Sequence, residues 1–162
     1  MVKTMTGTLP WAVVVVAIGG AIWWLLSRDM AAGPWLLAAL LVGHGVVHVL
    51  FAVPTPAATD GGAEWPFDMA QSWAVTRAGL DLNLVRGIGA VLIATTVGAF
   101  ALAALSTVGL IVPSGWWQPT IALGATASAA MLVLFFEPQL VLGLGIDAVL
   151  LWVVVTRAWV VA

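Results

Sequence analysis

Long uninterrupted runs of apolar residues, separated by short clusters of Pro, Gly and charged residues, dominate the chain. A helix needs about 20 consecutive apolar residues to cross the hydrocarbon of a bilayer. Runs of that length cover residues 9–27, 31–53, 80–112, 116–136 and 140–160. The pattern therefore predicts an all-α integral membrane protein with five transmembrane helices in a single domain, an extra N-terminal helix preceding a four-helix core.

Helix-breaking residues mark the limits of these runs. Gly33-Pro34 opens the second run and Pro54 closes it, while Pro113 and Glu137-Pro138 separate the later ones. Proline lacks the backbone donor that a helix interior requires, so each of these positions predicts a helix boundary. Trp residues collect near the ends of the runs, as is typical of membrane–water boundaries.

The first run has an alternative interpretation as a signal peptide, because Lys3 precedes it. Arg28-Asp29 stands where small residues should precede a cleavage site, however, so we interpret residues 9–27 as a retained helix.

The longest connection spans residues 54–79 and contains an amphipathic segment, residues 66–76. At helical spacing, Phe67, Ala70, Trp73 and Ala74 share one side of that segment. We therefore expect a short helix that lies in the membrane interface; a coil that happens to hold two Trp residues is the alternative.

Composition agrees with a membrane location. Hydrophobic residues make up 63% of the chain and charged residues 7%, and the mean hydropathy is +1.15. A soluble domain usually has about 25% charged residues, so a free soluble enzyme and a nucleic-acid-binding protein are excluded. The absence of cysteine excludes iron–sulfur clusters and thiol-based cofactors. Lys and Arg divide almost evenly between the two faces, and we expect a multi-pass protein of the cell membrane with a cytoplasmic N-terminus.

Away from the ends of the predicted spans, four ionisable residues stand out: His44, His48, Arg86 and Asp147. An ionisable group inside the membrane costs about 2.5–3.5 kcal/mol on insertion scales, so each requires an explanation. With the helix directions alternating, all four are expected in the same half of the bilayer. This half would also hold the hydroxyls of Thr126 and Ser128.

The facing of these residues follows from helical periodicity. Gly143 lies one turn before Asp147 and is expected to let another helix approach. Small residues line the side of the third run that carries Asn83 and Arg86, which predicts that this side packs into the bundle; they are Ala90, Ala94, Gly98 and Ala101.

Structural roles are the simplest explanation for these groups. Arg86 and Asp147 are candidates for an ion pair between the third and fifth helices. His44 is equally a candidate for a hydrogen bond to a carbonyl or to Asp147 that fixes the helix register.

Four kinds of chemistry remain open. His44, His48 and Asp147 form a possible two-histidine, one-carboxylate metal set, but Gly45 stands where a zinc protease needs Glu. The two histidines share one helix side and are the only ones present, which excludes a haem bound by two histidines of this chain. A haem would need Met131, or a histidine from another chain, as its second ligand. The histidines and Arg86, with Trp73 above them, are candidate hydrogen-bond partners for a quinone head group, and Asn83 is a further candidate ligand. His48, His44 and Asp147 step inward from one face, as in a proton relay that stops near the midplane.

Three short motifs stand out along residues 31–160: His44, Gly45 and His48, then Arg77, Leu80, Asp81, Arg86 and Gly87, and finally Asp147. In these motifs the chain resembles small, uncharacterised bacterial four-helix membrane proteins, and its layout is broadly similar to that of the DoxX-like proteins. The resemblance implies a compact bundle with a polar pocket, and some DoxX-like proteins accompany thiol or quinone oxidation. This chain departs from any thiol-linked version because it has no cysteine.

These observations lead to two hypotheses. The first is a small membrane protein with a buried His/Arg/Asp pocket near one membrane face, which binds a quinone or a metal in a redox-linked role. The alternative is an accessory or structural subunit of a larger membrane complex or homo-oligomer, with the lipid bilayer as its other partner and without a site of its own.

Overall fold

The computed structural model describes residues 32–54 and 65–156, and within them helices, joined by turns and short loops, are the only regular secondary structure. The predicted span at residues 9–27 and the last residues of the final span lie outside this part of the chain. Four helical segments in the described residues are long and apolar enough to cross a membrane. They correspond to the second, third, fourth and fifth predicted spans.

The bounds of the helices follow the predicted breaks. α2 (Gly33–Val47) has Pro at its start and continues as the 3-10 helix η1 (His48–Ala52), after which Val53 is extended ahead of Pro54. α4 (Leu82–Thr107) begins at Asp81, whose carboxylate accepts hydrogen bonds from the backbone of Asn83 and Leu84. The turn η3 (Ser114–Trp116) leads into α5 (Trp117–Leu134), and η4 (Pro138–Leu140) leads into α6 (Val141–Thr156).

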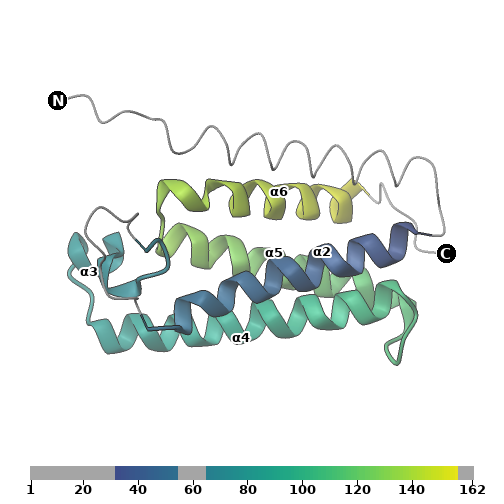
Figure 1. The fold of residues 1–162 in the computed structure, drawn as a ribbon, viewed down its shortest axis with the longest axis horizontal. Coiled ribbons are helices and arrows are strands. Elements are labelled where there is room, and N and C mark those ends of the chain that lie inside the picture. The colour runs from purple at the N-terminus through teal and green to yellow at the C-terminus, as the bar shows by residue number, and fades with distance from the viewer. Residues whose placement is uncertain (1–31, 55–64, 157–162) are drawn as a thin grey trace.

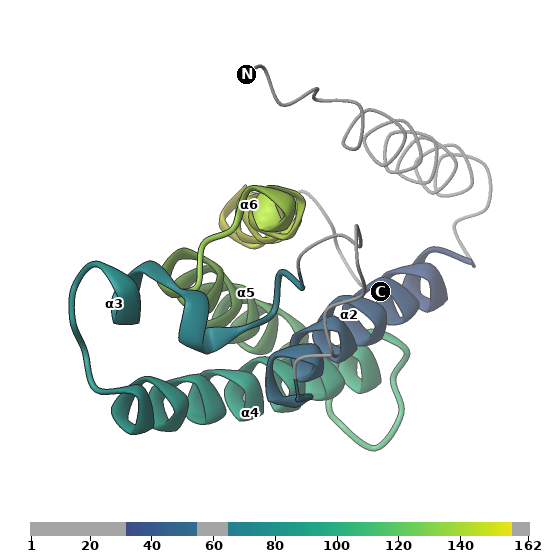
Figure 2. The ribbon, with the colours of Figure 1, turned by 60° about the vertical axis from the view of Figure 1, so that its left-hand side comes forward.

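The four long helices run alternately up and down along one axis (Figure 1). One end of the bundle gathers η1, the start of α4, the end of α5 and the start of α6, and α3 (Trp73–Thr76) also lies there. Figure 2 shows α5 between α4 and α6, with α2 crossing α4. Half of the α5 span is buried, against 17% of the α6 span, so α5 is the central helix and α6 a peripheral one in the described part.

The predicted interfacial helix at residues 66–76 is wrong in its extent. The structure has a 3-10 turn, η2 (Met69–Gln71), and then the single-turn helix α3, because Ser72 between them adopts an extended backbone. The side chains predicted to share one side of this helix do not all face the core: Ala74 is fully buried, whereas Trp73 is exposed. Trp73 donates its indole N–H to the carbonyl of Val133, which ties α3 to the end of α5.

The apolar core forms two separate clusters. The first contains side chains of α2, α4, α5 and α6 toward the end where α2 begins, among them Leu41, Phe100 and Leu150. The second lies toward the α3 end and includes Phe51, Met131 and Phe135. In α2–η1, α5 and α6 alike, the polar residues described below fall between the positions that contribute to these clusters.

A close approach between α4 and α5 depends on Gly124. A Cβ atom there would lie 2.6 Å from Cδ1 of Phe100, whose side chain is fully buried. An aromatic ring enclosed on all sides has no rotamer into which to retreat, so a methyl group at this position would force the helices apart.

We predict that Gly124→Ala lowers the free energy of unfolding by about 1–3 kcal/mol, because overpacking outweighs the helix-forming advantage of alanine. Gly145→Ala, on the exposed side of α6, is the matched control, since a Cβ there meets no atom within 4 Å and only the helix propensity changes. Unfolding in detergent micelles, followed by circular dichroism, measures both. Equal stability of the two variants would contradict the packing described.

Candidate functional site: a buried His–Ser–Asp network

α2 and η1 bring two histidines to the interior of the bundle. His44 lies in the last turn of α2 and His48 opens η1, four residues later on the same side. Their ring centroids are 5.0 Å apart with the planes nearly perpendicular, and Phe100 packs against His44 at 5.5 Å. Nδ1 of His48 donates a hydrogen bond of 2.8 Å to the backbone carbonyl of His44, which fixes the second ring.

α6 contributes a carboxylate at the same level. Nε2 of His44 lies 2.9 Å from Oδ1 of Asp147, which makes the predicted hydrogen bond between these two residues part of the structure. Gly143, one turn earlier on α6, allows this approach: a Cβ there would lie 2.7 Å from Leu132 and 3.7 Å from the His44 ring.

Ser128 of α5 links the two halves of the site. Its Oγ lies 2.6 Å from Oδ2 of Asp147 and 2.8 Å from Nε2 of His48. Counting about 1.5 Å per helical residue, Ser128 and Asp147 each lie about 9 Å from the end of their helix nearest α3. The four residues His44, His48, Ser128 and Asp147 form what we call the buried network.

The buried network is closed to solvent. Asp147 and Ser128 have no exposed surface, and His48 and His44 are 2% and 8% exposed. A charged or polar group in such surroundings is tolerated only when its hydrogen bonds are satisfied, and each of these side chains meets that requirement through another member.

Arg86 and Asn83 do not belong to the buried network, so the prediction that they point into the bundle is wrong. Both are exposed, as are the small residues on their side of α4. The core face of α4 is instead the neighbouring one, which carries Val85, Thr96 and Phe100. The alternative of an Arg86–Asp147 ion pair is also wrong: the only ion pair within residues 32–54 and 65–156 is that of His44 with Asp147.

Two other residues predicted near the site, Trp73 and Thr126, also lie outside the buried network, because their side chains are exposed. Trp73 is half-exposed, and its N–H already binds Val133. Thr126 is exposed, whereas Ser128, two residues on, is buried. The depth of the two hydroxyls was predictable from the Glu137-Pro138 break, but which of them faces inward depends on how α5 is rotated.

The geometry does not provide a metal-binding set. Within the described part of the chain, no group of three or more His, Cys, Asp or Glu side chains is arranged to hold a metal ion. The nitrogens and carboxylate oxygens of His44, His48 and Asp147 bind one another, Ser128 or a backbone carbonyl instead of converging on one point.

Arg86 does line a pocket of about 480 Å³ at the α3 end of the bundle. Asp68 is its other charged residue, and its apolar walls include Phe51, Phe67 and Ile93. Arg86 makes no ion pair with any described residue. We call this cavity the Arg86 pocket.

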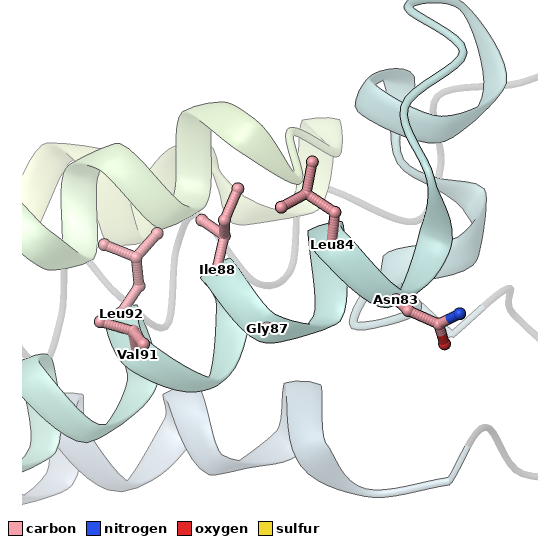
Figure 3. Close-up of a pocket in the computed structure, with 6 residues that line it drawn as sticks. All are labelled: Asn83, Leu84, Gly87, Ile88, Val91 and Leu92. Atoms are coloured by element: carbon pink, nitrogen blue, oxygen red, sulfur yellow. The ribbon is translucent and has the colours of Figure 1, made fainter.

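A second hollow is of a different kind. All of its lining residues come from α4, and Figure 3 shows the side chains of Leu84, Ile88 and Leu92 in one row along the helix, with Asn83 pointing elsewhere. A surface formed by one helix face with one polar side chain lacks the convergent polar groups of a ligand site.

Comparison with protein-family models, curated proteins and solved structures found no match to the chain. The resemblance to DoxX-like proteins therefore stays a prediction based on short motifs.

We predict that Ser128→Ala lowers the free energy of unfolding by about 1–3 kcal/mol, because it leaves Nε2 of His48 and Oδ2 of Asp147 buried without a partner. Thr126→Ala, on the same helix but exposed, should change it by no more than about 0.5 kcal/mol. Denaturant unfolding in micelles measures both free energies. An unchanged free energy of unfolding in Ser128→Ala would show that the hydrogen bonds of the serine do not stabilise the fold.

Proposed function

We propose that this is a multi-pass protein of the cell membrane that binds a small quinone-class ligand in the Arg86 pocket, in a redox-linked role. Membrane insertion is supported by the surface of the four long helices. Trp35, Val91, Val149, Trp152 and Val155 are each at least 60% exposed in the described part. Large apolar side chains at that exposure suit contact with lipid and would be costly in water.

The composition of the Arg86 pocket carries the ligand proposal. A guanidinium group offers several N–H donors to a carbonyl oxygen, and the surrounding Phe51, Phe67 and Ile93 offer surfaces for an apolar ring. The pocket also includes Val53 and Pro54, where α2–η1 ends, so it lies at the end of the bundle. A ligand with an apolar body and a polar head fits this position at a membrane boundary.

Phe51 connects the pocket with the buried network. It lines the pocket, and it follows His48 by three residues within the 3-10 helix η1. Residues at that spacing in a 3-10 helix stand one above the other, so His48 and Phe51 lie on the same side of η1. A protonatable group one helical turn from the pocket suits a ligand whose reduction takes up protons.

We predict that Arg86→Gln weakens binding of a short-chain quinone by about tenfold or more, because a hydrogen bond from a charged donor contributes about 1.5–3 kcal/mol. The measurement is isothermal titration calorimetry on the full chain in lipid nanodiscs. Arg77→Gln makes the same change at an exposed arginine outside the pocket and should leave binding unaltered. Absence of binding to the unaltered protein, or equal affinities of the two variants, would refute the assignment.

A second candidate function, a subunit of a membrane assembly, is favoured by the exposed face of α4. Ala90, Ala94 and Gly98 follow one another at four-residue spacing and are all exposed in the described part. Small residues at this spacing let two membrane helices approach closely, and we propose a second copy of the chain as the partner.

The absence of cysteine makes that proposal simple to test. We predict that Ala94→Cys forms a covalent dimer when membranes are oxidised, because paired α4 helices would bring the two sulfurs within disulfide distance. Ala148→Cys, exposed on α6, is the control and should stay monomeric. Gel electrophoresis reads out both, and equal crosslinking at the two positions would contradict the α4 interface.

A further inference from the structure

The hydrogen-bond partners of the buried network fix how many protons it contains. Nδ1 of His48 faces the carbonyl oxygen of His44 at 2.8 Å. A carbonyl oxygen only accepts hydrogen bonds, so Nδ1 of His48 carries a hydrogen. If that imidazole is neutral, its Nε2 is therefore an acceptor.

Three further contacts each need one hydrogen between the paired atoms. They join Nε2 of His48 to Oγ of Ser128 at 2.8 Å, Oγ of Ser128 to Oδ2 of Asp147 at 2.6 Å, and Oδ1 of Asp147 to Nε2 of His44 at 2.9 Å. The remaining approach, Oγ of Ser128 to Nε2 of His44 at 3.5 Å, is too long to count as a hydrogen bond of this kind.

Two neutral imidazoles and an ionised carboxylate cannot fill these contacts. Ser128 supplies one hydrogen and His44 one more from Nε2, which leaves one contact with a lone pair on each side. Two facing lone pairs in a site without solvent repel each other and leave both atoms unsatisfied. One additional proton removes the deficit.

The additional proton has only two positions that complete the chain. On Nε2 of His48 it gives an imidazolium that donates to Ser128, which donates to the carboxylate. On Oδ2 of Asp147 it gives a carboxylic acid that donates to Ser128, which donates to His48. Placed on Nδ1 of His44, it would leave the deficient contact unfilled.

The net charge of the buried network also favours one additional proton. With the additional proton the buried network is neutral overall, and without it a net negative charge lies in an apolar interior. No described residue compensates that charge. Across α2–η1, α4, α5 and α6, the only ionisable side chain outside the network is Arg86, which is exposed.

We propose that the buried network is a proton-binding site that holds one proton between His48 and Asp147, with Ser128 as the bridge. The proton moves when Nε2 of His48 gives its hydrogen to Oγ of Ser128 while the hydroxyl passes its own hydrogen to Oδ2 of Asp147. No bond between heavy atoms changes, and the step reverses along the same path. This site does not depend on a ligand in the Arg86 pocket.

The proton count can be measured on the full chain in nanodiscs without any ligand. Because the chain has only two histidines, ¹⁵N-histidine labelling gives two imidazole signal sets, which backbone connectivity assigns. Infrared difference spectra against Asp147→Asn report whether Asp147 is a carboxylic acid. Near neutral pH we expect either an imidazolium at His48 or a carboxylic acid at Asp147. Two neutral imidazoles with an ionised Asp147, or an imidazolium at His44, would overturn the proposal.

Asp147→Asn provides an independent test. The amide donates to Ser128 from Nδ2 and accepts from His44 at Oδ1, so all three contacts fill without an additional proton. We expect this variant to keep both histidines neutral and to melt close to the unaltered protein. Asp147→Leu, which keeps the branched shape but has no hydrogen-bonding group, should melt well below it. Equal loss of melting temperature in the two variants would show that the amide does not fill the three contacts, and would contradict the proton count derived from them.

Discussion

A carboxylate without exposed surface governs the architecture of this bundle. Asp147 has only the side chains around it for compensation, and those side chains come from two other helices: His44 from α2 and Ser128 from α5. A carboxyl group in apolar surroundings, ionised or protonated, is unfavourable without hydrogen-bond partners, so the three helices must meet at one level and in one rotation. The two apolar clusters pack on either side of the buried network that these contacts form.

The sequence allowed the helices and part of the site to be predicted. Proline breaks located most ends of the four described long helices to within a few residues, because a helix interior requires the backbone N–H that proline lacks. The common level of His44, His48 and Asp147 followed from alternating helix directions and is confirmed by their contacts. Two partners were considered for Asp147. The ion pair with Arg86 is wrong, and the hydrogen bond with His44 is confirmed.

The errors have a common physical cause. Small residues permit close helix packing on any side, so Ala90, Ala94 and Gly98 indicated a packing face without indicating whether it belongs inside the bundle. The interior side of α4 carries Phe100, which is accommodated by Gly124 on a different helix. The hydrophobic pattern of either helix alone does not show that Phe100 packs against Gly124. The short segment before α4 depended similarly on the backbone of a single residue, Ser72.

The limited burial of α6 has a mechanical consequence. This helix packs along α5, with 17% of its span buried in the described part, and its polar attachment to the bundle is confined to Asp147. Sliding α6 by one turn, about 5.4 Å, would remove both partners of the carboxylate at once. Tilting of α6 about Asp147 would keep both hydrogen-bond partners of the carboxyl group. Asp147 therefore acts as a pivot that prevents translation of the helix while leaving its two ends free to tilt.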